Sequence, residues 1–296
     1  DIDLLLLAGH LSREELAMIL RKRRFARGAL ELSMPEVEID LGEQGEVVGA
    51  HLASNDESHQ VIGEFMLAAN EAVATFLTEK HAGFLRRAHA HPEPRKLDDF
   101  AEFARSLGLT IDQPQSRFEL QRVLAQSAGR PEQHAVHFGL LRSLKQATYT
   151  PETEGHYALA SDNYCHFTSP IRRYPDLLVH RAIKAALVGQ GYTPGNWQEL
   201  GQHCSMTERR ADEATRDVTN WLKCYYMRDR IGEIFAGTIA SVVSFGIFVA
   251  LDTVYVEGLI HVSELGEEYF QFDNLRHQMV GERTGRRFRL GDRLQV

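Results

Sequence analysis

The chain has 296 residues, of which 43% are hydrophobic and 25% charged, as is ordinary for a globular protein long enough to form two domains. Its formal net charge of −8 argues against a surface coated in nucleic acid, although a basic channel inside an acidic shell is still allowed. No stretch approaches the roughly 18 consecutive apolar residues of a membrane span, so we expect no membrane contact.

The first residue is Asp1 rather than Met, which indicates a processed product or a piece of something longer. The early "DLLLLAG" is too short for a span and has no basic leader, so we expect no signal peptide. Three cysteines, Cys165, Cys204 and Cys224, stand far apart without a CxxC pair. This usage argues against a zinc ribbon or a disulfide framework and predicts a cytoplasmic location.

The first elements of the chain carry clear local signals. In "SREELAMILRKRRFARGAL", Ser12 and Glu15 have the spacing of a capping box, which predicts a helix start. The stretch "PEVEIDLGEQGEVVGAHLA" alternates and turns at Gln44–Gly45, which predicts a β-hairpin. The next segment, "QVIGEFMLAANEAVATFLTEKHA", has apolar residues at helical spacing, and we expect a buried helix.

Further helices are expected downstream, and the pattern then changes. A short helix in "KLDDFAEFARSLGL" should end at Gly108, and a long polar-faced helix is expected over residues 197–233. From about Gly232, short β-branched runs alternate with turn residues, which is an all-β pattern. We therefore predict an α+β, mostly helical domain over residues 1–230 and a small β-barrel domain over residues 231–296.

The predicted β-domain combines aromatic and basic residues. Phe245 and Phe248 flank a glycine on one strand, and His261 lies on the next strand. The closing stretch, "MVGERTGRRFRLGDRLQV", is rich in arginine and includes Arg287 and Arg289. Aromatics beside a basic rim can stack single-stranded bases, but strand aromatics are as often core residues and the arginines a solvated edge.

A resemblance favours the first of these alternatives. The stretch "GTIASVVSFGIFVALDTVYVEGLIHVSEL" resembles the S-one-type OB fold of RNA-binding domains, through its glycine spacing, "FGIFV" and "EGLIHVSEL". The resemblance implies that Phe245, Phe248 and His261 face RNA. Because the family continues past "GDRLQV", we expect the barrel to be incomplete.

The helical domain carries a second resemblance. "GHYALASDNYCHFTSPIRRYPDLLVHRAI" resembles the signature of the ribonuclease II / ribonuclease R family of hydrolytic 3′-to-5′ exoribonucleases. Further matches follow the family order: "RFARGALEL", "GEFMLAANEAVA", "RRAHAHPEPRKL" and "LRSLKQATY". The resemblance implies an RNB-type catalytic domain that degrades single-stranded RNA to nucleoside 5′-monophosphates with Mg²⁺. We expect a monomer.

The adjacent arginines in "SPIRRY" call for an anion, since two neighbouring cations repel each other. The resemblance implies that Arg172 approaches the scissile phosphate, where a planar guanidinium grips two oxygens and stabilises developing charge. Arg173 is expected to pair with a carboxylate or a phosphate, and Tyr174 and Asp176 to orient the pair. A purely structural role at a helix start explains these three residues equally well.

The resemblance implies two further residues near RNA and two departures from the family pattern. Arg87 and His89 match the family's Arg-x-His near the RNA path, although His89 is alternatively an ordinary loop residue. Leu32 replaces a stacking aromatic found in many members, and Gly63–Glu64 replaces a pair of glutamates. These departures affect the expected rate and product length.

The family's metal-binding aspartates have no counterpart in this sequence, so no metal ligand is predicted. Asp98 and Asp99 are adjacent in a predicted helix and point apart, which favours a solvated face. Two other functions stay open: a non-catalytic module that binds single-stranded RNA, and a structural adaptor that uses the β-domain for protein contacts. We expect the aspartates upstream in an intact enzyme and expect the chain alone to be inactive.

Overall fold

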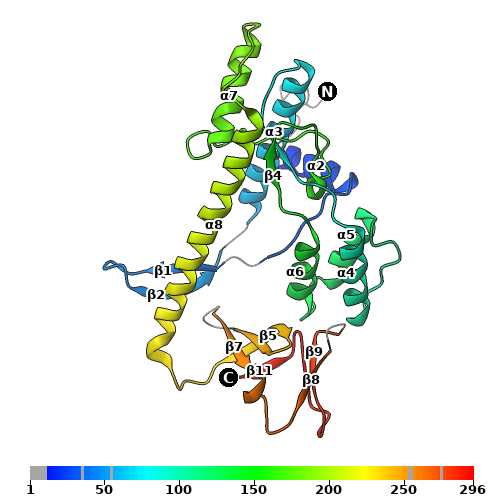
Figure 1. Cartoon of the computed structure of the whole chain (residues 1–296), viewed down its shortest axis with the longest axis vertical. Helices are drawn as coiled ribbons and strands as arrows, with labels where there is room; N and C mark the ends of the chain where they lie inside the picture. Colours follow the sequence, from blue (N-terminus) through cyan, green and yellow to red (C-terminus); the bar gives the residue numbers. More distant parts are fainter. Residues whose placement is uncertain (1–11, 35–36, 54–55, 253–255, 274–275) are drawn as a thin grey trace. The chain divides into compact units, whose positions relative to one another are not determined.

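A computed structural model of the chain describes residues 12–296 except 35–36, 54–55, 253–255 and 274–275 (Figure 1). The chain divides into two compact units, each assembled from three stretches of sequence. The first unit contains Asp1–Leu30, Ser54–His91 and Lys145–Asp212, and the second contains Glu31–Ala53, Pro92–Leu144 and Glu213–Val296. The mixed α+β class is confirmed, while the division at residue 230 stays a prediction.

The first unit begins with helix α2 (Arg13–Ala26). The predicted capping box is present: the Ser12 hydroxyl accepts from the Glu15 amide at 3.1 Å, and the Glu15 carboxylate accepts from the Ser12 amide at 2.7 Å. Two backbone donors that the helix start leaves unpaired are thereby satisfied. Helix α3 (Glu57–Glu79) packs against α2.

Helix α3 is less buried than its apolar pattern predicted. Its buried residues are Glu64, Asn70, Ala74 and Leu77, whereas Ile62 is 60% exposed. The buried Glu64 carboxylate accepts from Nε of Arg24 in α2 at 3.2 Å, so a buried ion pair joins the two helices. By length and hydropathy α3 could also cross a membrane, but this is weak evidence because core helices of soluble proteins pass the same test.

The rest of the first unit surrounds a small two-stranded sheet. Strands β3 (Arg86–Ala88) and β4 (Thr148–Thr150) pair antiparallel. A short 3₁₀ turn, η1 (Tyr157–Leu159), precedes helix α7 (Tyr174–Leu187), and the long helix α8 (Trp197–Met227) follows. Among the residues that the structure describes, Leu77, Phe84, Cys165 and Val179 belong to one apolar cluster of this unit, and Leu85, Tyr149, Leu178 and Cys204 belong to another.

The second unit contains the predicted hairpin and a group of three helices. Strands β1 (Val37–Leu41) and β2 (Val47–Leu52) pair antiparallel, and Gly45 adopts φ +80° in the turn, which a residue with a Cβ rarely tolerates. Helices α4 (Pro94–Ser106), α5 (Arg117–Ser127) and α6 (Gln133–Ser143) pack side by side (Figure 1). Gly108, with φ +76°, ends α4 as predicted.

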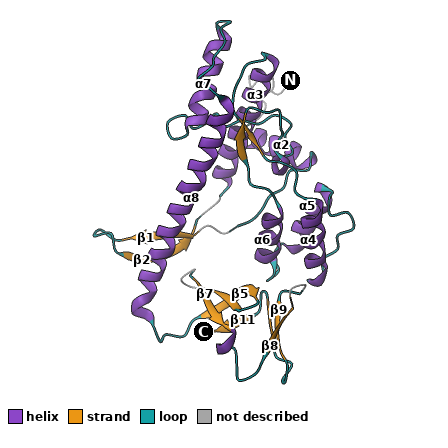
Figure 2. Ribbon diagram, viewed as in Figure 1, coloured by secondary structure: helices purple, strands orange, loops and turns teal. Residues whose placement is uncertain are grey.

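The C-terminal strands form two sheets (Figure 2). After the 3₁₀ turn η2 (Arg228–Arg230), strands β5 (Ala236–Val243), β6 (Gly246–Leu251), β7 (Glu257–His261) and β11 (Arg293–Gln295) form one sheet. Strands β8 (Phe270–Asp273), β9 (Gln278–Gly281) and β10 (Arg287–Arg289) form the other. Ile239, Ile247, Phe270, Met279 and Phe288 belong to one core that both sheets share.

The C-terminal strands agree with the incomplete barrel that the sequence analysis expected. Among the strands that the structure describes, pairing runs within the four-stranded and the three-stranded sheets and does not close a ring. The 3₁₀ turn η3 (Val262–Glu264) follows β7, where the chain leaves the first sheet. Backbone bonds from Ile239 to Asp292 and from Gly291 to Ile239, each 2.9 Å, tie β5 to the turn before β11.

Two helix glycines give a matched test of packing. A Cβ added at Gly63 in α3 would meet nothing within 4 Å, whereas one at Gly201 in α8 would lie 2.6 Å from the Tyr149 carbonyl oxygen. We expect Gly63→Ala to stabilise the chain by about 0.5–1 kcal/mol, because alanine loses less backbone entropy in a helix. Gly201→Ala should destabilise it by about 1–3 kcal/mol through overpacking. Denaturant unfolding measures both, and a stabilising Gly201→Ala would contradict the packing described.

Candidate nucleic-acid interface

The segment that leads to the paired arginines is anchored at Tyr164 and Phe167. Asn70 in α3 donates to the Tyr164 hydroxyl at 3.0 Å and accepts from the Phe167 amide at 3.0 Å. His180 in α7 contacts the Phe167 carbonyl at 2.9 Å through Nε2, and its ring stacks on the Phe167 ring with centroids 4.3 Å apart. These contacts fix the backbone just before the arginines.

Residues 169–173, which precede α7 and contain the paired arginines, are called the arginine loop below, and Asp176 is its central hydrogen-bond acceptor. Its carboxylate is completely buried in the first turn of α7, where Oδ1 accepts from the Ser169 amide at 2.8 Å and from Arg173 at 2.7 Å. Arg173 therefore has the carboxylate partner that the sequence analysis left as one alternative. Its predicted contact with RNA stays a prediction.

Arg172 differs from its neighbour. Its side chain is exposed, and within the described part of the chain it has no ion pair or side-chain hydrogen bond. Ile171 is fully exposed and Tyr174 is 47% exposed beside it. The fold thus neutralises Arg173 and leaves the guanidinium of Arg172 available for an anion.

Arg87 and His89 lie on and just after β3. The Arg87 guanidinium donates to the Glu208 carboxylate at 2.6 Å and lies 4.6 Å from the centroid of the Tyr149 ring. His89 is only 6% exposed, and its ring packs edge-on against that of His156 at 4.9 Å. The structure therefore places His89 inside the unit rather than on a loop surface, and its direct contact with RNA stays a prediction.

Buried histidines accompany these arginines. Burial, together with the nearby His89 and Arg87, lowers the pKa of His156 to about 3. Burial lowers the pKa of His166 to about 3 as well, with further contributions from Arg173, Arg87, His156 and Arg172. Both imidazoles are neutral at physiological pH, so the positive charge near this loop comes from arginine.

In the β-domain, the three residues predicted to face RNA lie close together. Phe248 points to the face of the sheet opposite the buried Ile247 and Val249, because side chains alternate along a strand. The Phe245 and Phe248 rings are 6.3 Å apart, and Phe245 is 48% exposed. His261 is exposed and pairs in register with Gly246, directly after Phe245. This geometry presents an aromatic surface.

Arg287 and Arg289 occupy the other sheet. Both are exposed on β10, with the buried Phe288 between them on the opposite face. Arg289 lies 3.8 Å from Asp292, which offsets part of its charge. Their role in RNA binding stays a prediction.

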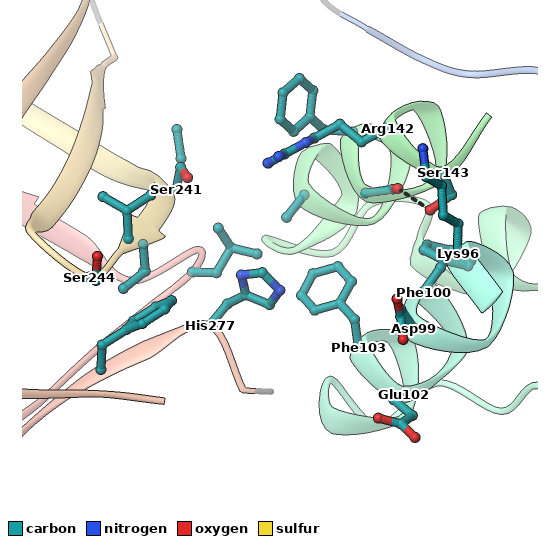
Figure 3. Close-up of a pocket in the computed structure, with 18 of the residues that line it drawn as sticks. Lys96, Asp99, Phe100, Glu102, Phe103, Arg142, Ser143, Ser241, Ser244 and His277 are labelled. Carbon is teal, nitrogen blue, oxygen red and sulfur yellow. Dashed lines mark hydrogen bonds between the residues drawn. The ribbon is translucent and has the colours of Figure 1, made fainter. Parts of the chain in front are cut away.

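A pocket of about 890 Å³ within the second unit adds residues that the sequence analysis did not select (Figure 3). Phe245 and other residues of the β5–β6 turn line one side, and α4 and α6 line the other. Lys96 and Arg142 supply positive charge, and the Arg142 guanidinium lies 5.9 Å from the centroid of the Phe138 ring. Figure 3 shows Arg142 extending into the pocket above the facing rings of Phe103 and His277, whose centroids are 4.6 Å apart. In the sequence, the signal that could have indicated this pocket is the positive charge of Lys96 in α4 and Arg142 in α6.

An exposed guanidinium suits the oxygens of a phosphate group, and exposed aromatic side chains suit stacked bases, so both features are typical of proteins that bind nucleic acid. Comparisons with known proteins agree. Residues 9–189 match the RNB domain, and residues 228–296 match the S1 RNA binding domain. The chain therefore belongs to the RNB family, as the sequence resemblance indicated.

Individual relatives give the same result. Ribonuclease R of Escherichia coli (strain K12) is 40% identical in an alignment 294 positions long, which covers 94% of this chain and 36% of that protein. Ribonuclease R of Aquifex aeolicus (strain VF5) is 40% identical in an alignment 292 positions long, which covers 96% of this chain and 41% of that protein. The chain thus spans well under half the length of these curated relatives.

A solved structure of Mycoplasma genitalium RNase R in complex with ribose methylated single-stranded RNA matches with a TM-score of 0.86 and 27% identity. The match covers 96% of this chain and 46% of that one. Nearly the whole described fold is therefore that of a ribonuclease R structure.

The buried histidines predict an acid sensitivity. The folded chain keeps His166 unprotonated down to about pH 3, whereas the unfolded chain takes up a proton near the ordinary pKa of 6.5. The unfolded state therefore binds more protons below about pH 6.5, and the free energy of unfolding should fall as the pH drops through this range. Thermal unfolding from about pH 7.5 to about pH 4.5 measures the slope. His166→Gln should reduce this slope, whereas a change at the exposed His203, His203→Gln, should leave it unchanged. Equal slopes in the two variants would contradict the prediction.

Proposed function

We propose that this chain is part of a hydrolytic 3′-to-5′ exoribonuclease that degrades single-stranded RNA to nucleoside 5′-monophosphates. The observation that carries the proposal is the arginine loop: Asp176 neutralises Arg173, while Arg172 is exposed and has no ion pair in the described part of the chain. Family membership supports the reaction class. The three unpaired cysteines support a reducing, cytoplasmic location, and we propose a monomer.

The proposed role of Arg172 is to stabilise charge on the scissile phosphate. Hydrolysis of a phosphodiester builds negative charge on the phosphoryl oxygens and on the leaving oxygen. A guanidinium held by an anchored loop meets that charge without reorganising, and its planar fork contacts two oxygens. The Asp176 carboxylate and the Asn70 amide hold the loop in place.

Mg²⁺ is proposed as the cofactor of the intact enzyme. The residues that the structure describes do not fit a magnesium site, because they include no group of three His, Cys, Asp or Glu side chains that could hold a metal ion. Asp98, one of the two adjacent acids, accepts from Gln115 and is exposed on α4. We propose that aspartates outside this chain bind the metal.

One other function stays open, a non-catalytic module that binds single-stranded RNA. The aromatic surface of Phe245, Phe248 and His261 supports binding under either proposal. Hydrolysis of RNA by the intact protein separates the two, since a binding module forms a complex but releases no mononucleotides.

Arg172→Lys tests the catalytic assignment in the intact ribonuclease. The charge stays but the fork is lost, so single-turnover cleavage of a short poly-A should slow by on the order of 100-fold or more. RNA affinity in EDTA should change little, because many other phosphate contacts remain. Arg289→Lys serves as the control, with slightly weaker binding and unchanged turnover on saturating RNA. Equal losses of rate and affinity in Arg172→Lys would make it an ordinary phosphate anchor.

Arg142, which lines the pocket together with both basic and acidic side chains, predicts a salt-dependent contribution to RNA binding by the chain itself. Each neutralised phosphate of a single strand contributes roughly −0.7 to the slope of log affinity against log salt. Arg142→Gln should make that slope shallower by about 0.7. Arg122→Gln on the neighbouring α5, whose guanidinium already pairs with Glu119 at 2.6 Å, should leave the slope unchanged. Affinity that is flat with salt in the wild type would favour the adaptor function instead.

A further inference from the structure

Glu208 lies in helix α8, which the sequence analysis described only as a long polar-faced helix. In the structure, its carboxylate reaches strands β3 and β4. Oε2 accepts from Nη1 of Arg87 at 2.6 Å, and Oε1 accepts from the Tyr149 hydroxyl at 3.3 Å. The Arg87 side chain is 15% exposed and that of Glu208 29%, so this ion pair is largely shielded from water.

Arg87 is held from more than one direction. Its guanidinium lies 4.6 Å from the Tyr149 ring centroid, while Glu208 binds one of its nitrogens. Its backbone amide donates to the Tyr164 carbonyl at 2.9 Å, two residues before His166. A guanidinium fixed in this way presents its remaining donors in one direction, which a freely moving arginine does not.

The contact continues toward the arginine loop. The Tyr149 hydroxyl lies 2.8 Å from Nδ1 of His166, and a carboxylate can only accept a hydrogen bond. One arrangement satisfies both contacts of the hydroxyl: Tyr149 donates to Glu208, and Nδ1–H of His166 donates to Tyr149. His166 is thereby fixed as one tautomer at the start of the segment that leads to Arg172.

We propose that Glu208 is a positioning residue that holds Arg87, and through Tyr149 the segment carrying Arg172, in the orientation that RNA requires. This inference rests on the proposed function and deepens it. Two simpler roles make different predictions. A residue that only neutralises Arg87 would, when removed, strengthen RNA binding, and one that only ties α8 to the sheet would change stability alone.

A double-mutant cycle in the intact ribonuclease tests the proposal. The variants are Glu208→Gln, Arg87→Ala and the pair together, with Glu213→Gln, an exposed glutamate of the same helix, as the matched control. For each variant we would measure single-turnover cleavage of a short poly-A, poly-A affinity in EDTA and thermal unfolding. Glu208→Gln should slow cleavage about 10-fold to 100-fold, as expected for misplaced groups at a reacting centre. In the Arg87→Ala background it should cost only severalfold more, because the link through Tyr149 is then the one contact of Glu208 left to lose and contacting residues are not additive.

Other outcomes overturn the inference. If the rate losses of the two single variants multiply in full in the double variant, Glu208 does not act through Arg87. If Glu208→Gln leaves the cleavage rate per folded molecule unchanged, Glu208 only ties α8 to the sheet. Should Glu208→Gln fail to fold, Tyr149→Phe keeps the Arg87 ion pair and removes only the hydroxyl link, and it should still slow cleavage severalfold. If the wild-type protein binds poly-A without cleaving it, the proposed enzyme function is wrong. The same double-mutant cycle, measured as poly-A affinity in EDTA, would then test whether Glu208 acts through Arg87.

Discussion

The arginine loop depends on one buried carboxylate. Asp176 accepts from both the Ser169 amide and the Arg173 guanidinium, so a single side chain fixes the loop backbone and neutralises one of two adjacent cations. A carboxylate buried without such partners would cost several kcal/mol. The arrangement therefore requires an arginine at position 173 for folding, and it leaves position 172 free of that requirement.

The described fold repeatedly uses long-range polar pairs to hold short segments in place. Arg24 and Glu64 join two helices, Asn70 holds the segment before the arginines, and Glu208 binds Arg87. Each pair is separated by at least 40 positions in sequence. These polar contacts help to define how the loop and the strands are oriented.

The sequence predicted what local chemistry encodes. The capping box at Ser12, the hairpin turn at Gly45 and the end of α4 at Gly108 each depend on a few adjacent residues, and all are present. The burial of His89 and the partial exposure of α3 were not predictable, because burial depends on which distant segments pack against a residue. The pocket beside Phe245 was missed for the same reason, since its lining comes from several stretches that lie far apart in the sequence.

The unequal environments of Arg172 and Arg173 have a consequence for genetics. Two neighbouring arginine codons would produce different kinds of loss-of-function allele. A change at Arg173 removes the charged partner of the buried Asp176, which should lower the amount of folded protein in the cell. On the proposed function, a change at Arg172 leaves normal amounts of a protein that still occupies RNA ends without processing them. Such an allele would compete with the wild-type enzyme and be dominant, whereas the first would be recessive.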